Sequence, residues 1–444
     1  MNVIGFLFLL ITSVAILRLP RSWAPLPLLM AACYITFAQV LMVGPFHFTI
    51  VRVLVLLGVL RALARRERLP GGLNRLDWVM IMWGTWEVFA SVFHRPFGDA
   101  LVLRLGIAYN TLGIYFLMRM FCQGTKDIVQ IIQIIAFLLV PVAMEMANEK
   151  GTGRNLFAML GGISEVVEVR DGKLRAAGPF GHAILAGTVG AMCIPLMIGV
   201  WRQNRVTAVI GLVAASTMVI SSTSSGPLMS VMFGLLGLGI WRWRHLTGRM
   251  RIAAVIGYIL LDLVMKDPAY FLFSRIDLTG SSTGWHRVEL IRSASRHLNE
   301  WWFAGTDYTR HWMINGLPSM PSHCDITNHY LAYGVSGGLP LMILFICALW
   351  VAFSNVGQYL ELRAEAPFPE RFLVWSVGAN LFAHTITCFS VSYFDQSIVF
   401  LCVTLGILGS LPATAAAAAE EESDSEGSPD AFQDERDVKS SKAV

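Results

Sequence analysis

Residues 325–353 read DITNHYLAYGVSGGLPLMILFICALWVAF. The run that follows Gly338 is almost wholly apolar and belongs to a segment long enough to cross the roughly 30 Å of hydrocarbon in a bilayer as a helix. Polar and aromatic side chains, from Asp325 to Tyr330, crowd its leading edge, although a membrane helix does not need them for stability. The stretch therefore indicates a transmembrane helix whose polar leading end has a role besides spanning the membrane.

The composition of the whole chain agrees with a membrane protein. Of its 444 residues, 55% are hydrophobic and 14% are charged, and the mean hydropathy is +0.59. Soluble proteins carry roughly 25% charged residues. Because a segment in lipid must satisfy its own backbone hydrogen bonds, the spans should be α-helices. We predict an all-α, polytopic helix bundle whose first segment, residues 2–17, is a retained span, since it shows no basic region or cleavage site.

Thirteen apolar segments are candidate spans. Alternate connections between them are rich in arginine, as in residues 61–75, whereas the short connections on the other side carry only Arg95. Basic residues gather in cytoplasmic loops, so the N-terminus is expected outside and the C-terminus inside. The predicted spans lie near residues 2–17, 24–43, 46–64, 76–93, 100–120, 127–147, 182–201, 206–221, 226–241, 251–266, 334–354, 371–390 and 394–411.

Two long segments, 148–181 and 267–333, then fall on the outer face. Within the second, WHRVELIRSASRHLNEWW (285–302) suits an amphipathic helix, on which Arg287 projects from the apolar side. The tail, residues 412–444, is acidic and poor in aromatic residues, which predicts disorder. We therefore predict one transmembrane domain over residues 1–411 and a disordered cytoplasmic tail.

Cysteine usage and charge exclude several classes of protein. Of the seven cysteines, only Cys324 lies far from a predicted span, since Cys122 lies just past the span 100–120, so no disulfide framework is expected. Neither a CxxC motif nor a His-x-x-x-His pair is present, so we expect no metal site. The net charge of +4 is too small to indicate a nucleic-acid partner.

Charged residues inside predicted spans are costly and point to function. Five of them fall in the outer half of their helices, which predicts a polar cavity that opens to the outer face. Ion pairing between neighbouring helices, or snorkelling to the interface, is the alternative for each one. These residues are Arg52, Glu87, Arg104, Glu145 and Asp262.

The outer segments are rich in arginine, whose planar and permanently charged fork binds phosphate. A lipid diphosphate could enter such a site from the bilayer. Arginines would stabilise the leaving charge without a metal, and a histidine or carboxylate would activate an acceptor hydroxyl. Aromatic residues such as Trp301 and Tyr308 would stack on sugars or form an interfacial belt.

Four stretches resemble the O-antigen ligase-like family of bacterial membrane proteins, which includes O-antigen ligases and the O-antigen and exopolysaccharide polymerases. They occupy roughly the second half of the chain. The stretches are RAAGPFGHAILAG (175–187), SSTSSGPLMS (221–230), HRVELIRSASRHL to WWFAGTD (286–307) and DITNHYLAYGVSGGL (325–339).

The resemblance implies a GT-C-like bundle of about a dozen spans in the bacterial inner membrane, with periplasmic loops. It further implies metal-independent, inverting glycosyl transfer from an undecaprenyl-diphosphate-linked glycan to a glycan or lipid acceptor, without a cofactor. Membrane lipids and other polysaccharide-assembly proteins would be the further partners.

The resemblance and the charges together nominate site residues. Arg287, Arg175 and Arg104 are the candidates for binding donor phosphate. Asp325, Asn328 and His329 are the candidate catalytic residues. His182, Thr327, Tyr330 and Asp307 are the candidate substrate contacts.

The chain also departs from the family pattern. Thr327 stands where O-antigen ligases carry a catalytic histidine before the asparagine, although Asn328 and Gly338 keep the expected spacing. Residues 224–226 read Ser-Ser-Gly where Ser-Arg-Gly is common. The departures favour a polymerase or another glycan transferase over transfer to lipid A core. Asp325 or His329 would then be the base, unless the cluster merely caps the following helix.

Two alternative functions stay open. The first is a transporter, or flippase, of lipid-linked glycans, although such proteins commonly show internal repeats and midplane sites, and the sequence shows no convincing repeat. The second is a non-catalytic component of a polysaccharide export system. The absence of the histidine expected at position 327 and of the arginine expected in the Ser-Arg-Gly element favours this alternative. Replacement of Arg287 and Asp325 without loss of glycan product would indicate the second.

Overall fold

The computed structural model describes residues 1–44, 46–265, 268, 284–314, 316–317 and 320–426. It is 74% helical, so the prediction of a mostly helical chain is confirmed. The α-helices are α1 (Val3–Arg18), α2 (Pro25–Tyr34), α3 (Ile50–Ala64), α4 (Arg75–Ala90), α5 (Phe97–Phe121), α6 (Thr125–Thr152), α7 (Ala183–Gly199), α8 (Arg205–Ser221), α9 (Ser225–Gly239), α10 (Thr247–Val264), α11 (Gly284–Arg296), α12 (Leu298–Trp301), α13 (His329–Leu362), α14 (Phe368–Thr387) and α15 (Ile398–Glu426).

Short 3-10 helices and three antiparallel hairpins complete the described ranges. The 3-10 helices are η1 (Arg21–Trp23), η2 (Ser91–Phe93), η3 (Leu156–Leu160), η4 (Val200–Arg202), η5 (Ile240–Leu246) and η7 (Arg310–Trp312). The paired strands are β1 (Val40–Val43) with β2 (Phe46–Thr49), β3 (Glu168–Arg170) with β4 (Lys173–Arg175), and β5 (Gly316–Leu317) with β6 (Met320–Cys324).

Five helices in the described ranges are long and apolar enough to cross a membrane, namely α5, α6, α7 with η4, α13, and α15 as far as Ala419. The apolar helices α1 and α8 are shorter. These lengths agree with a membrane protein, whereas the thirteen-span bundle and its GT-C-like fold stay predictions.

Helix α7 lies at the centre of the bundle, where it contacts α8, α9 and α14. Within its most apolar stretch, 89% of the residues are buried. Small residues allow the close approach, because a Cβ added to Gly190 would lie 2.7 Å from the carbonyl oxygen of Ala215 on α8. The first of the four family-like stretches therefore leads directly into the best-packed helix.

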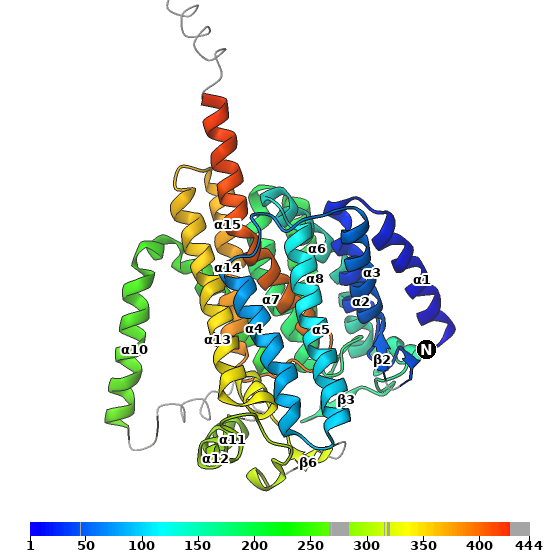
Figure 1. Cartoon of the computed structure of the whole chain (residues 1–444). Coiled ribbons are helices and arrows are strands. Elements are labelled where there is room, and N and C mark those ends of the chain that lie inside the picture. The colour runs from blue at the N-terminus through cyan, green and yellow to red at the C-terminus, as the bar shows by residue number, and fades with distance from the viewer. Residues whose placement is uncertain (45, 266–267, 269–283, 315, 318–319, 427–444) are drawn as a thin grey trace, which may run out of the picture.

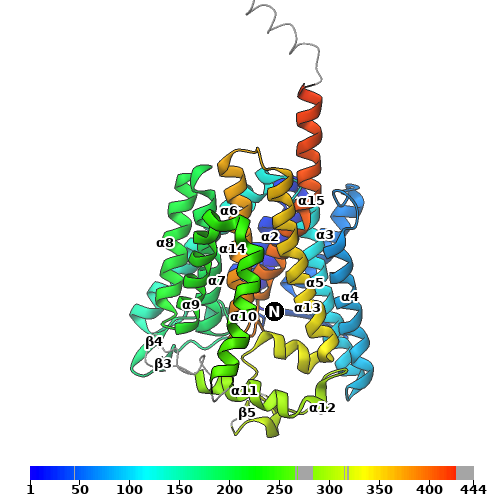
Figure 2. The same ribbon diagram turned by 90° about the vertical axis from the view of Figure 1, so that its left-hand side faces the viewer.

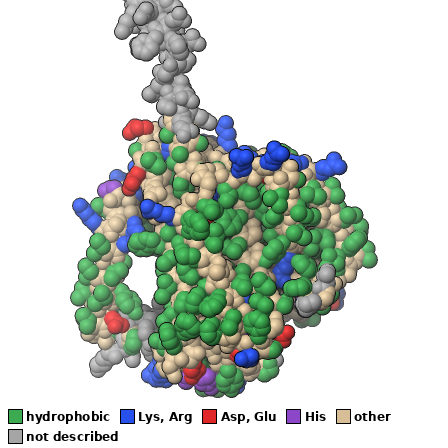
Figure 3. Space-filling view, in the orientation of Figure 1, with side chains coloured by type: hydrophobic (Ala, Val, Ile, Leu, Met, Phe, Trp, Pro, Cys, Tyr) green, Lys and Arg blue, Asp and Glu red, His purple; other side chains and the backbone are tan. Residues whose placement is uncertain are grey.

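The two ends of the bundle differ in character (Figures 1 and 2). Helix α15 projects from one end, whereas β3, β4, α11 and α12 lie at the opposite end. Lys and Arg side chains line the end from which α15 projects (Figure 3). The exposed arginines Arg65, Arg66 and Arg68, in the connection between α3 and α4, are among the charges of the predicted cytoplasmic loops. The described parts of the long segments predicted to face outward thus lie together at the other end.

The predicted span over residues 24–43 is wrong in its second half. Helix α2 ends at Tyr34, and Val40 pairs with Thr49 in the β1–β2 hairpin instead. Gly44, with φ of +59°, lies between the two strands. The predicted span over 46–64 therefore begins as a strand and becomes helical at Ile50. Hydrophobicity alone does not separate an apolar hairpin from a helix.

The tail also differs from the prediction over its first residues. Disorder was expected from Pro412 onward, but α15 continues to Glu426. The run of alanines after Thr414 has the highest intrinsic helix propensity of any residue type, and this outweighs the polar composition. Residues 427–444 of the predicted disordered tail lie outside the described residues.

Helix α13 is broken where the polar lead meets the apolar run. Gly337 and Gly338 leave helical geometry, with φ and ψ of 75° and −175° at Gly338. The N–H of Leu339 donates to the carbonyl oxygen of Trp302 at 2.8 Å, and Thr306 N donates to Val335 O at 2.9 Å. The break thus seats the WWFAGTD segment, residues 301–307, against the start of α13.

Candidate functional site

The β3–β4 hairpin, at the end of the molecule opposite α15, carries the first half of the candidate site. Asp171 and Gly172 turn the chain with φ of 51° and 73°, which is typical of a tight hairpin turn. The register places Glu168 directly opposite Arg175. Their side chains form an ion pair at 2.7 Å, in which Arg175 is buried and Glu168 is half-exposed.

Arg175 also connects two of the family-like stretches. Its Nη2 donates to Ser224 Oγ at 2.8 Å, and Ser224 in turn donates to the carbonyl oxygen of Ser222 at 2.9 Å. The arginine predicted to bind donor phosphate therefore already has a carboxylate and a hydroxyl partner. Its geometry suits positioning of the β3–β4 hairpin against the start of α9.

His182 stands beside the same carboxylate. Its Nε2 lies 3.5 Å from Glu168 Oε2, and its Nδ1 accepts a hydrogen bond from Ile184 N at 3.2 Å as the N-cap of α7. Burial lowers the pKa of His182, Glu168 and Asp325 act against this, and Arg175 and Arg170 add to it. The charge of Asp325, in the fourth family-like stretch, thus raises the pKa of His182, in the first.

The amphipathic helix α11 joins this cluster from the third stretch. His286 Nε2 lies 3.0 Å from the backbone carbonyl oxygen of Asp325. Arg287 Nε donates to the carbonyl oxygen of Ser390 at 3.2 Å. Burial lowers the pKa of Arg287, and the positive charge of Arg170 adds to this. Two arginines and an exposed carboxylate, Asp325, thus stand near one another at one end of the bundle.

The lead of α13 is more structural than predicted. Asn328 Oδ1 accepts from Leu331 N at 3.1 Å and caps the helix. The His329 ring is buried among Tyr333, Phe345 and Tyr393, and its Nδ1 accepts from Tyr393 N at 3.3 Å. The prediction of His329 as a catalytic base therefore does not fit this burial. Asn328 has the geometry of a helix cap, which was the alternative to a catalytic role.

Tyr330 and Thr327, which were predicted to contact substrate, have hydroxyl groups that point into the protein. The Tyr330 hydroxyl is turned into the bundle, where it donates to the carbonyl oxygen of Thr385 at 2.8 Å. Thr327 Oγ1 is buried, and no hydrogen-bond partner for it is found among the described residues. Of the cluster from 325 to 330, Asp325 is the member whose side chain is exposed.

Two further nominated residues, Arg104 and Asp307, belong to one separate network. The ring of His94 bonds to the Asp307 carboxylate, and Arg95 N donates to that carboxylate at 2.9 Å. Partial burial opposes the ionisation of Asp307, but these contacts outweigh it and hold its pKa below the usual range. Arg104 donates to Ser336 Oγ at 3.0 Å and lies 3.5 Å from Glu87.

This network fastens α4 and α5 to the start of α13. Arg104 and Glu87 are both buried, so the guanidinium predicted to bind donor phosphate faces a carboxylate inside the protein. A buried charge without a partner is strongly destabilising. Arg104 and Glu87 each supply the other's partner, which gives the pair a structural role. The prediction of Arg104 as a phosphate ligand does not agree with this position.

The predicted polar cavity of five charges is not what the structure contains. Glu87 and Arg104 contact each other, but the remaining three residues have separate surroundings. Arg52 Nη1 donates to His47 O at 2.6 Å, and Glu145 accepts from Leu156 N at 2.7 Å. Asp262 lies on α10, which has no buried residue. Similar depth along different helices does not bring charges together.

The site contains residues that the sequence analysis missed. Glu168 joins Arg175 to His182, and His94 joins Arg104 to Asp307. The Asp171-Gly172 pair was a usable signal for the first, since this dipeptide favours a two-residue hairpin and counting outward from it pairs Glu168 with Arg175. No local signal links His94 to Asp307, which are 213 residues apart.

The lowered pKa of His182 predicts a pH effect on stability. Below the ordinary histidine value of about 6.5, the unfolded chain takes up this proton before the folded chain does, so stability falls as the pH falls. We expect the unfolding temperature to drop more between pH 7.5 and 5.5 in the wild type than in His182→Asn, which keeps an N-cap acceptor. Equal drops in the two proteins would contradict this assignment.

Comparison with known proteins adds no assignment. No family model matches the sequence, and no curated protein matches it. Kinship with the O-antigen ligase-like family therefore stays a prediction that depends on the four stretches.

Proposed function

We propose that this protein is a membrane glycan transferase that uses a polyprenyl-diphosphate-linked glycan as donor and extends or transfers O-antigen or exopolysaccharide units. One observation carries the proposal: the four family-like stretches, distant in sequence, are joined in two pairs by hydrogen bonds at one end of the bundle. Arg175 bonds to Ser224 at 2.8 Å, and His286 lies 3.0 Å from Asp325 O. The segments around Trp302 and Leu339 bond to each other at 2.8 Å.

The charges at this end suit a diphosphate donor. Arg287 uses Nε for the Ser390 carbonyl oxygen, and among the described residues no hydrogen bond of its two Nη groups is found. An arginine fork in this state can bind a phosphate oxygen pair. Arg170 lies close enough to influence Arg287, so two positive charges would share the charge of the leaving diphosphate.

Asp325 is the best candidate for the base, since its carboxylate is exposed beside His182. In the proposed step, an acceptor hydroxyl oxygen forms a bond to the anomeric carbon of the donor glycan. The bond from that carbon to the diphosphate oxygen breaks, and the diphosphate leaves on the polyprenyl lipid. The hydroxyl proton passes to Asp325, which general-base catalysis requires to lie within reach of the acceptor.

The experiment uses purified full-length protein in detergent, an undecaprenyl-diphosphate-linked oligosaccharide, and no added divalent metal. Longer lipid-linked glycans and free undecaprenyl diphosphate are expected from the wild type. Asp325→Asn should slow their formation by about 10²–10⁴-fold, the usual contribution of a general base. The matched control is Glu289→Gln, which removes a carboxylate on α11 that pairs with Arg292 at 3.9 Å. If wild-type protein binds the donor but never lengthens or transfers the glycan, the proposal is wrong.

A transporter of lipid-linked glycans is the second candidate, and the position of α10 suits a transporter as well as it suits a transferase. None of the residues of α10 is buried, and an opening separates this helix from the rest of the protein (Figure 3). Arg251 reaches across to the ring of Trp350 on α13, 5.3 Å from its centroid. Such an opening could admit a polyprenyl chain for transport as well as for transfer. Movement of donor across proteoliposomes without any extension of the glycan would favour the transporter.

A further inference from the structure

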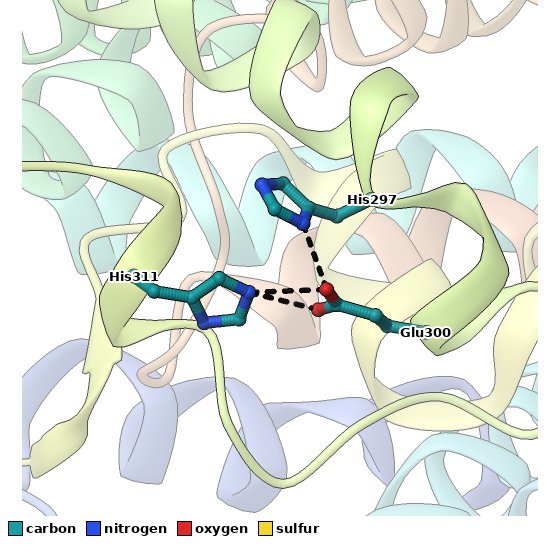
Figure 4. A group of neighbouring side chains, drawn as sticks. All are labelled: His297, Glu300 and His311. Carbon is teal, nitrogen blue, oxygen red and sulfur yellow. Dashed lines mark hydrogen bonds and ion pairs between the residues drawn. The ribbon is translucent and has the colours of Figure 1, made fainter.

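A second group of chemically active side chains lies in the segment between α10 and α13, apart from the residues discussed above. His297 follows α11, Glu300 lies in α12, and His311 lies in η7. All three side chains point toward one another (Figure 4). Two imidazoles and one carboxylate are a ligand set that zinc ions use in proteins.

The distances are close to those that an ion needs. His297 Nδ1 lies 2.7 Å from Glu300 Oε1, and His311 Nε2 lies 3.1 Å and 3.0 Å from the two oxygens of the same carboxylate. All the ligand atoms lie within 4.8 Å of one another. Bonds of about 2.0–2.1 Å in a tetrahedral site separate neighbouring ligands by roughly 3.3 Å. The carboxylate contacts of 2.7–3.1 Å are therefore close to the spacing of a metal site, and the set as a whole lies within 4.8 Å.

Neighbouring rings hold the three side chains in this arrangement. Trp312 Nε1 donates to Glu300 Oε2 at 3.2 Å, which leaves Oε1 turned toward both histidines. The His311 ring stacks on Tyr308 with centroids 5.2 Å apart, and the His297 ring lies parallel to Trp312 at 6.0 Å. Groups that orient ligands in this way tune real metal sites.

We propose that His297, Glu300 and His311 bind a Zn²⁺ ion, with water in the fourth position. Mixed nitrogen and oxygen ligands suit zinc, whereas Mg²⁺ and Ca²⁺ prefer oxygen alone. The ion would join α12 to η7 and so hold the loop that carries α11 and the 301–307 segment. The site is separate from the proposed transfer step and does not depend on it. The spacing of these ligands, at 297, 300 and 311, matches neither a CxxC nor a His-x-x-x-His pattern.

The test is calorimetric titration of ZnCl₂ into full-length, chelator-treated protein purified in detergent without a polyhistidine tag. We expect one ion to bind per chain. Three variants each remove one proposed ligand: His311→Ala, His297→Ala and the conservative Glu300→Gln. Loss of a group that only orients a ligand costs up to about 100-fold in metal affinity, so each variant should weaken binding by at least that factor. Thiols are poor competitors in the folded protein, because six of the cysteines are buried and Cys347 is half-buried.

His47→Ala is the matched control, because His47 is an exposed histidine elsewhere on the protein, and its binding of ZnCl₂ should equal that of the wild type. The unfolding temperature supplies an independent measurement, since a ligand that binds the folded state raises it. ZnCl₂ should raise it in wild type and His47→Ala but not in Glu300→Gln, and MgCl₂ should raise it in none. Failure of wild type to bind ZnCl₂ below about 1 mM, or undiminished binding by Glu300→Gln and His311→Ala, would overturn the proposal.

Discussion

Arg287→Ala is expected to slow glycan transfer by about 10²–10³-fold while leaving the fold intact. The side chain lies on α11, where its Nε donates to the Ser390 carbonyl oxygen at 3.2 Å. Although burial and Arg170 lower its pKa, a guanidinium keeps its charge at neutral pH. Loss of one preorganised donor to a developing negative charge costs about 10²–10³-fold in rate, and loss of the fork should also weaken donor binding.

Measurement should separate these two effects. Lipid-linked products are quantified at several donor concentrations for wild type, Arg287→Ala and Arg287→Lys. The lysine variant keeps the charge but not the planar fork, so it should recover part of the rate. Arg292→Ala is the matched control, because it removes an exposed arginine from the same helix. An Arg287→Ala protein as active as the wild type would rule out the arginine site, although glycan transfer itself would then be established.

Gly338→Ala is expected to destabilise the protein by about 3–5 kcal/mol, because it combines strain with overlap. With φ of 75° and ψ of −175°, Gly338 has a conformation that is nearly exclusive to glycine. An added Cβ would overlap the Phe303 carbonyl oxygen and lie 2.7 Å from Ala304 N. Both neighbours are backbone atoms that cannot rotate away, so the 301–307 segment must leave its seat on α13.

Gly357→Ala provides the control in the same helix. No heavy atom lies within 4 Å of a Cβ added there, and replacing a helical glycine by alanine stabilises by up to about 1 kcal/mol. Unfolding of both variants is followed in the same detergent by tryptophan fluorescence against temperature and denaturant. Similar midpoints for Gly338→Ala and the wild type would contradict the seating of this segment.

The same glycine shows how far local sequence can predict a site. Gly338 was noted for its spacing from Asn328, and the structure supplies a physical reason, since the break in α13 needs a residue without a Cβ. The Asp171-Gly172 pair likewise predicts its hairpin from backbone preference alone. In both cases the identity of a residue decides which backbone conformations it can adopt.

Patterns of hydrophobicity and polarity gave wrong predictions where the same composition is compatible with two local structures. Residues 40–49 are largely apolar, yet residues 40–43 pair as a strand with residues 46–49. Helix propensity then outweighed polarity in the first part of the tail. His329 looked like a base because of its neighbours in sequence, but α13 turns its ring into an aromatic cluster. The hairpin and the position of the His329 ring are not visible before the helices pack, whereas the helical start of the tail follows from local propensity.

The sequence by itself determined the helical class of this protein and the contrast between its basic and its polar connections, because hydrophobicity, charge and chain punctuation act over a few residues. Only the tertiary structure decided which charged and polar groups meet. It buried Arg104 beside Glu87 and joined Arg175 to Ser224. It also turned His297 and His311 toward one carboxylate. Such partners are set by the packing of distant segments, and the cost of leaving a buried polar group unpaired makes that choice specific.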